Sequence, residues 1–112
     1  MTTCRRGDIV LVSFVFADEK GVKKRPAVVL SSEPYHSGRH EMIVAAITSN
    51  ADHILTGDHR IKDWKSCGLP LPSVVTAIIR TIKQDMVAKT IGTLPSPERK
   101  AFDKNLKVVL SL

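Results

Sequence analysis

The chain has 112 residues, a formal net charge of +6 at pH 7 and a sequence pI near 9.6. This length allows one domain with a single core and excludes two, and the 43% hydrophobic and 25% charged shares are ordinary for a soluble globular protein. No apolar run approaches the roughly 20 residues that a transmembrane helix needs, so we expect one domain over residues 1–112, no membrane span and a mild attraction for nucleic acids.

The N-terminal part of the chain predicts a β-hairpin. Residues 8–16 are nearly continuously apolar and rich in β-branched side chains, which is typical of a short buried strand. Residues 18–21 supply turn chemistry, and a second strand is expected over residues 27–30. Pro26 lacks an N–H, so it belongs at the first residues of that strand or on a sheet edge. No small-residue cleavage site follows the first apolar run, so we expect a cytoplasmic protein.

The middle of the chain predicts more strands, separated by loops that proline, glycine and polar residues mark. In chain order we expect a loop at 33–40, a strand at 42–47, irregular structure at 51–72, and strands at 73–82 and 86–94.

The C-terminal segment changes to a helical period. Ser96 is expected to cap the helix, with Pro97 at the first helical position and Glu98 beside the positive helix end. An apolar stripe with helical spacing follows, formed by Phe102, Leu106, Val109 and Leu110. Five or more antiparallel strands and one packing helix predict a mainly β fold, a compact barrel with a helical lid.

The usual catalytic and metal-binding signatures are absent from the sequence. There is no glycine-rich phosphate loop and no HExxH or GxSxG motif. His36 and His40 are four residues apart, but a proline and a glycine argue against the helix that would align them. His53 and His59 lie in an irregular acidic region. We interpret all four as solvated loop histidines and the two cysteines as free thiols, and we expect no metal site and no cofactor.

RNA is a substrate that supplies its own nucleophile, because its 2′-hydroxyl can attack the adjacent phosphorus. The protein must then position the backbone, neutralise charge on the phosphoryl oxygens and assist proton transfer. Arg25, held extended by the following proline, and Thr48, where an apolar strand ends, are suited to this task. Such residues are also common at strand ends without any catalytic role, so neither identifies a site alone.

Taken together, however, several short segments resemble the MazF/PemK (Kid) toxins. They are GDIVLVSF, KKRPAVVLSS, AAITSN, the Gly-Leu and Ser of CGLPLPSVV, IRTI and IGTL, in the order and spacing of that family and over nearly the whole chain. The resemblance implies an SH3-like barrel of the MazF/CcdB type with added helices. It also implies a homodimer that acts as the toxin of a type II toxin–antitoxin system.

The resemblance further implies a metal-independent, sequence-selective endoribonuclease. It would cleave single-stranded RNA through the substrate 2′-hydroxyl, leave a cyclic phosphate and a free 5′-hydroxyl, and be neutralised by an acidic antitoxin. By position in the motifs, Arg25 corresponds to the family's catalytic arginine and Thr48 to its catalytic threonine. Further candidates for positioning or RNA binding are Asp8, Lys20, Lys23, Lys24, Arg80 and Gln84, the three lysines forming a basic rim that the antitoxin would also contact.

One departure from the family leaves the general base unassigned. Some members carry an acidic residue shortly before the Arg-Thr-Ile segment, whereas residues 76–79 here are Thr-Ala-Ile-Ile. The base could be a histidine, a carboxylate elsewhere, or unnecessary in a mechanism that relies on electrostatics. Two other functions stay open: a CcdB-like toxin that poisons DNA gyrase without catalysis, and a non-catalytic RNA-binding barrel, against which the 4% aromatic share argues. The RNA recognition sequence and the antitoxin cannot be read from the chain.

Overall fold

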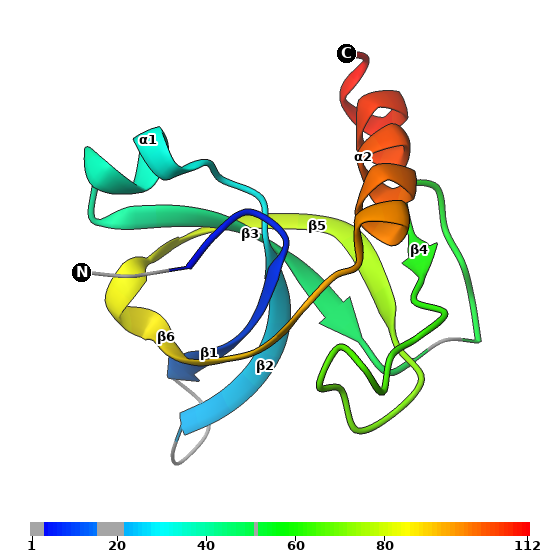
Figure 1. The fold of residues 1–112 in the computed structure, drawn as a ribbon, viewed down its shortest axis with the longest axis horizontal. Coiled ribbons are helices and arrows are strands. Elements are labelled where there is room, and N and C mark those ends of the chain that lie inside the picture. The colour runs from blue at the N-terminus through cyan, green and yellow to red at the C-terminus, as the bar shows by residue number, and fades with distance from the viewer. Residues whose placement is uncertain (1–3, 16–21, 51) are drawn as a thin grey trace.

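The computed structural model describes residues 4–15, 22–50 and 52–112, which form a curved antiparallel sheet with two helices (Figure 1). Neighbouring strands follow the order β4-β5-β3-β2-β1-β6. The strands are β1 (Asp8–Val15), β2 (Val22–Val29), β3 (Glu41–Thr48), β4 (His59–Arg60), β5 (Val74–Lys83) and β6 (Val87–Thr93). The helices are α1 (Glu33–Ser37) and α2 (Ser96–Leu110), and a 3-10 turn, η1 (Gln84–Met86), joins β5 to β6.

The central strands are nearly continuously apolar because both of their faces are buried. Successive side chains of a strand point to opposite faces, and Val28 of β2 belongs to one core while its neighbours Ala27 and Val29 belong to the other. The first core lies under α2 and contains Phe102, which is 1% exposed. The second contains Met42 on the opposite face of the sheet. Burial on both faces explains why these strands lack the alternation of a half-exposed sheet.

The mainly β fold and the C-terminal helix expected from the sequence are confirmed, but the sheet does not close into a barrel. Within the described chain its edges are β4, which has two residues, and β6. The segment after β4 covers β6 instead. A Cβ on Gly68 would lie 2.1 Å from the carbonyl oxygen of Ile91, and a Cβ on Gly92 would lie 2.1 Å from that of Cys67. Two glycines therefore let the loop backbone rest on the strand and shield this edge.

Two expectations about local structure were wrong. Residues 33–40, expected to be a loop, contain α1, because Pro34 lies in the first turn, where a helix needs no N–H. The second strand begins at Val22 rather than at Ala27, and Pro26 lies inside it. Pro26 is tolerated there because β2 pairs with β1 along this half, whereas its pairing with β3 begins only at Ala27.

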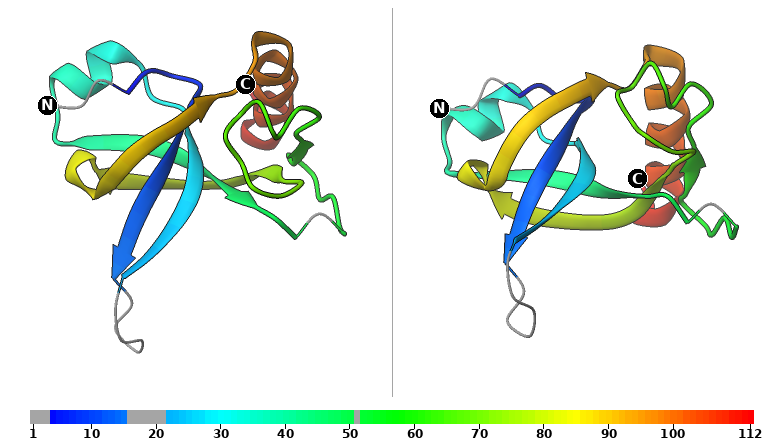
Figure 2. Two further views of the ribbon diagram at one scale, coloured as in Figure 1. Left: turned by 60° about the horizontal axis from the view of Figure 1, so that its bottom comes forward. Right: turned by 90° about the horizontal axis from the view of Figure 1, so that it is seen from below.

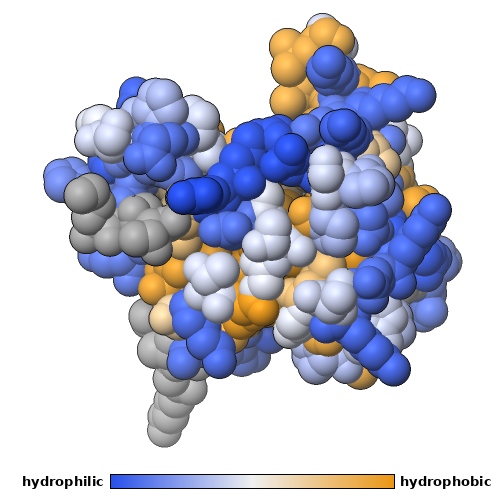
Figure 3. Space-filling view, viewed as in Figure 1, coloured by the Kyte–Doolittle hydropathy of each residue, from blue (hydrophilic) through white to orange (hydrophobic). Residues whose placement is uncertain are grey.

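The C-terminal helix differs from expectation at both ends. Pro95 occupies the cap position and Ser96 is already helical. Phe102 and Leu106 are buried as expected, but Val109 and Leu110 are 39% and 50% exposed, because the last turns of α2 extend past the sheet (Figures 1 and 3). The stripe therefore packs against the core only along its first half.

The remaining expected strands lie within one or two residues of the observed ones. The expectations for Phe16 and for the turn at 18–21, including Lys20, fall outside the described residues. No helix in the described part of the chain is long and apolar enough to cross a membrane.

Candidate active site

Arg25 and Thr48 lie opposite each other where β2 and β3 separate. The last paired residues are Ala27 and Ala46. In an antiparallel pair each step along one strand is a step back along the other, so continuing this register places Arg25 across from Thr48. The strands no longer pair there, and the two side chains line one hollow of about 480 Å³. The structure thus brings together the two residues that the sequence nominated from separate motifs.

Two adjoining hollows share Arg25. The larger hollow is lined by residues from the adjoining parts of β2 and β3 and by residues of the loop before β5. The smaller, about 270 Å³, has an apolar floor and places Arg25 near Arg80 of β5. Besides these arginines and Thr48, the two hollows are lined by Pro26, Ala27, Val44, Ala46, Ile47, Ser49, Leu69, Pro70, Leu71, Ser73 and Ile78.

A β-bulge widens the sheet on the other side of β3. The register between β3 and β5 shifts between Ala45 and Ile47, so β5 carries extra residues opposite Ala46. The Thr76 hydroxyl stabilises the bulge by donating to the Ala46 carbonyl at 2.8 Å and accepting from the Ile78 N–H at 3.2 Å. This threonine lies in the segment where some of the toxins that the motifs resemble carry an acid. Here its hydroxyl shapes the strand and turns Ile78, 62% exposed, into the smaller hollow.

The hydroxyl of Thr48 is held by the chain that follows it. Its oxygen accepts a hydrogen bond from the Asn50 N–H at 3.1 Å, which fixes the side chain and leaves the hydroxyl proton available to a ligand. Arg25 is exposed and Thr48 is half-buried, so both can be reached from solvent. Of the described residues that line the two hollows, none is Asp, Glu or His. A proton acceptor is therefore not found among them.

The other sequence candidates lie in three different places. Lys23 and Lys24 are exposed on the half of β2 that leads to the hairpin, which extends beyond the rest of the sheet (Figure 2). Asp8 accepts hydrogen bonds from the Arg5 N–H and the Thr93 hydroxyl, and so holds the start of β1.

Gln84 holds the turn between α1 and β3. Its amide nitrogen lies 3.0 Å from each of three carbonyl oxygens, those of His36, Arg39 and Glu41. These contacts occupy the amide donors of Gln84.

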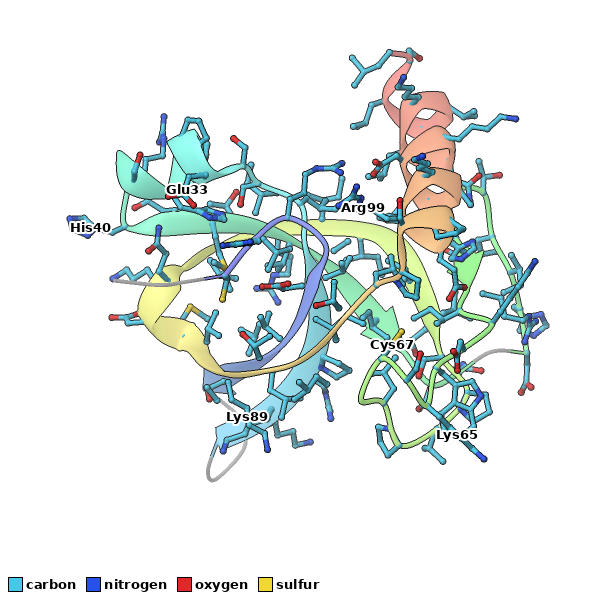
Figure 4. The ribbon with its side chains drawn as sticks, viewed as in Figure 1. Glu33, His40, Lys65, Cys67, Lys89 and Arg99 are labelled. Carbon is cyan, nitrogen blue, oxygen red and sulfur yellow. The ribbon has the colours of Figure 1, made fainter. Side chains whose placement is uncertain are left out.

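Sequence reasoning missed the loop that forms the far wall of the larger hollow. Leu69, Pro70 and Leu71 come from the segment interpreted only as irregular, and Ser73 was expected to begin the next strand. The sole signal for this wall was the Gly-Leu and Ser of the family motif. Cys67 lies just before this wall, with its side chain turned inward while Lys65 points outward from the same loop (Figure 4). Burial, and then the nearby charge of Glu98, raise the pKa of the Cys67 thiol, which makes it a poor nucleophile.

The described residues contain no group of three or more His, Cys, Asp or Glu side chains placed to hold a metal ion. His59, expected to be a solvated loop histidine, instead pairs with Glu98 at 3.0 Å in a largely buried contact.

Comparison with known proteins agrees with the motifs. The model of the PemK-like, MazF-like toxins of type II toxin–antitoxin systems matches residues 5–110. Endoribonuclease MazF6 of Mycobacterium tuberculosis and endoribonuclease MazF2 of Mycobacterium bovis are each 33% identical to this chain over 93 residues, which cover 80% of it and 81% of the relative.

Solved structures show the same fold. A MazE–MazF complex from Deinococcus radiodurans matches with a TM-score of 0.82 at 18% identity, covering 100% of this chain and 99% of that one. An endoribonuclease in complex with its cognate antitoxin from a mycobacterial species matches with a TM-score of 0.78 at 15% identity, covering 98% and 97% of the two chains. On the strength of the family match over nearly its whole length, the chain belongs to the PemK-like, MazF-like toxins of type II toxin–antitoxin systems.

Proposed function

We propose that this protein is a metal-independent endoribonuclease that cleaves single-stranded RNA at short sequences. The observation that carries the proposal is the position of Arg25 and Thr48, which line one open hollow where β2 and β3 separate. An arginine, a hydroxyl and a groove suffice when the substrate brings its own nucleophile. The mycobacterial relatives named above are endoribonucleases, which supports the same activity here.

In this mechanism the protein positions the RNA and stabilises charge. The guanidinium of Arg25 contacts the phosphoryl oxygens, on which negative charge grows as the 2′-hydroxyl attacks. The bond between the 2′-oxygen and phosphorus forms as the bond from phosphorus to the 5′-oxygen breaks, and solvent water accepts the 2′-hydroxyl proton and protonates the departing 5′-oxygen. Thr48 donates its hydroxyl proton to an oxygen of the same phosphate. Arg80, with Lys23 and Lys24, binds neighbouring phosphates, and the apolar floor of the smaller hollow contacts a base. Lys20, which the sequence nominates for the same role, lies outside the described residues.

The protein's partners follow from the same surface. We propose a homodimer of one-domain subunits, residues 1–112, in the cytoplasm, where RNA is available. We also propose that an acidic, largely disordered antitoxin segment folds along the basic groove and competes with RNA, because a chain rich in Asp and Glu mimics a polyanion. Structures of similar fold have been solved with their antitoxins, which supports this expectation.

The test is incubation of the purified protein with a defined pool of single-stranded RNA in EDTA, followed by mapping of the cleaved ends. We expect cleavage at a short recurring sequence, with a cyclic phosphate on one product and a 5′-hydroxyl on the other. If EDTA abolishes cleavage and a divalent ion restores it, the metal-independent mechanism is wrong. If RNA stays intact while DNA gyrase is inhibited, the CcdB-like alternative replaces this function.

A further inference from the structure

Glu98 is a buried carboxylate outside the two hollows. It lies in the first turn of α2, is 7% exposed, and accepts hydrogen bonds from the Lys62 N–H at 2.6 Å, the Asp63 N–H at 3.5 Å and His59 Nε2 at 3.0 Å. A buried carboxylate is stable only when its oxygens are satisfied, and these donors satisfy it. Glu98 therefore ties the start of α2 to the segment that follows β4.

The same face of α2 contacts this segment at two further levels. Asn105 donates to the Asp58 carbonyl at 2.9 Å. One turn later, Val109 packs closely on Gly57: a Cβ added to Gly57 would lie 2.6 Å from Cγ2 of Val109. Positions 98, 105 and 109 share one face of a helix, so α2 acts as a strap along residues 57–63.

Residues 57–63, which α2 contacts, lead along the chain into the loop that lines the larger hollow. The Ile61 N–H donates to the Ser73 carbonyl at 3.0 Å, and the Leu69 N–H to the Trp64 carbonyl at 3.1 Å, so the chain between them is compact. Gly68 fixes its far side by resting on β6 at Ile91. Leu69, at the end of these contacts, is a lining residue of the hollow that contains Arg25 and Thr48.

We propose that Glu98 is a positioning residue for RNA cleavage: by binding His59 and the backbone at 62 and 63, it holds residues 69–73 at the distance from Arg25 that the substrate requires. This role rests on the proposed function. It does not make Glu98 or His59 catalytic, because neither lines a hollow. A misplacement of about 1 Å at an enzyme site can cost about 100-fold in rate, so a wall that drifts should be visible in the kinetics.

The decisive variants differ in whether the hydrogen bonds of Glu98 to His59 and to the backbone remain. His59→Gln keeps a nitrogen donor near the place of Nε2, whereas His59→Leu removes it. Glu98→Ala removes the acceptor oxygen that both the Lys62 N–H and His59 Nε2 contact. Asp103→Ala is the matched control, because Asp103 is also on α2 but binds Arg6 on another side of the helix, at 2.7 and 3.0 Å.

We expect single-turnover cleavage at saturating RNA to fall about 10- to 100-fold in His59→Leu and Glu98→Ala, and less than about 3-fold in His59→Gln and Asp103→Ala. Amide hydrogen exchange should accelerate at residues 62–73 in the first two variants and stay unchanged in β1 and β3. Unchanged exchange in a folded Glu98→Ala protein would show that Glu98 does not hold this segment, and would overturn the proposal. Faster exchange at 62–73 with full cleavage would show that the wall position does not matter, and would overturn the positioning role.

The exchange measurement separates this proposal from the proposed function. If the unmodified protein does not cleave RNA, the ribonuclease assignment fails first, while exchange at residues 62–73 still decides whether Glu98 holds the wall. If Glu98→Ala does not fold, the comparison of His59→Leu with His59→Gln decides, since equal cleavage by those two folded variants contradicts the proposal.

Discussion

At the scale of single residues, the proposed chemistry depends on side chains whose neighbours fix their positions. Pro26 keeps Arg25 in the extended region, and the Asn50 N–H fixes the oxygen of Thr48. The first is a backbone restriction and the second a single hydrogen bond, and both residues line the same hollow. Arg25 and Thr48 are therefore candidate site residues because β2 and β3 separate next to them.

Replacement of Arg25 and Thr48 tests this site directly. Arg25→Ala should slow single-turnover cleavage by about 10²–10³-fold, because one preorganised donor to the developing charge is lost. Arg25→Lys should recover little, since an ammonium cannot reproduce the planar two-pronged contact. Thr48→Val keeps the shape without the hydroxyl and should slow the reaction less. Melting curves measured beside the kinetics are the control, and full activity of a folded Arg25→Ala protein would contradict the assignment.

The thiol of Cys67 should be unreactive in the folded protein. Its pKa is raised above the ordinary 9.0, first by burial and then by the charge of Glu98, so little thiolate forms at pH 8. In a Cys4→Ser background we expect a thiol reagent to label the native protein slowly and the denatured protein rapidly. Equal rates would contradict the burial.

The raised pKa of the Cys67 thiol also makes the stability of the fold depend on pH. The unfolded thiol ionises at its ordinary pKa while the folded thiol stays protonated to higher pH. The contribution of this group to stability is therefore fully present below pH 9 and is lost as the pH rises from there through the raised pKa of the folded state. Denaturant melts across this range should show the free energy of unfolding falling with pH, and a Cys67→Ala variant should lose this component.

At the scale of elements, the loop after β4 replaces the strand pairing that would close a barrel. Gly68 has a φ of +81°, a conformation that residues with a Cβ rarely adopt, and its backbone rests on β6. Its partner Gly92 admits the carbonyl of Cys67 from the other side. Close approach of two backbones positions this loop, and through it the wall of the larger hollow.

Alanine at these glycines should therefore destabilise the protein strongly. Gly68→Ala and Gly92→Ala each place a Cβ 2.1 Å from a carbonyl oxygen, and we expect each to lower the free energy of unfolding by at least about 2 kcal/mol. Gly38→Ala is the matched control, because its Cβ would lie 3.7 Å from the nearest atom, the Pro34 carbonyl oxygen. Urea denaturation of the three variants checks this, and similar stabilities would show that the loop does not rest on β6.

At the scale of the whole molecule, apolar side chains remain exposed where α2 extends past the sheet. Val108, Leu110 and Leu112 are 67%, 50% and 85% exposed, and Leu55 in the loop before β4 is 70% exposed. Apolar surface gathers at the tip of α2 in Figure 3. A cluster of this kind is typical of a protein–protein contact, which supports the proposed dimer.

We expect light scattering at micromolar concentration to give twice the 12.3 kDa mass of one chain. Val108→Glu combined with Leu112→Glu should raise the dissociation constant at least about 100-fold, since each buried Val or Leu contributes about 1.5–3 kcal/mol. Lys89→Glu, an exposed residue of β6, is the control for added negative charge. A monomer mass for the unmodified protein would contradict the dimer.

Antitoxin and RNA should compete for the basic groove. In a fluorescence titration with a labelled uncleavable RNA, the cognate antitoxin segment should displace the RNA completely. Lys23→Ala with Lys24→Ala should weaken both ligands and reduce the salt dependence of RNA binding, since two phosphate contacts are lost. Formation of a ternary complex would exclude direct occlusion.

The sequence by itself determined the fold class, most of the strands and the family, because these depend on local apolar patterning and on short motifs. It also nominated Arg25 and Thr48. Only the tertiary structure decided what depends on contacts between distant segments: that the strands separate beyond Ala27 and Ala46, that the sheet stays open, and that Glu98 binds the backbone at 62. Such contacts leave no local pattern, since a buried carboxylate in a first helical turn has the same sequence context as an exposed one beside the helix dipole.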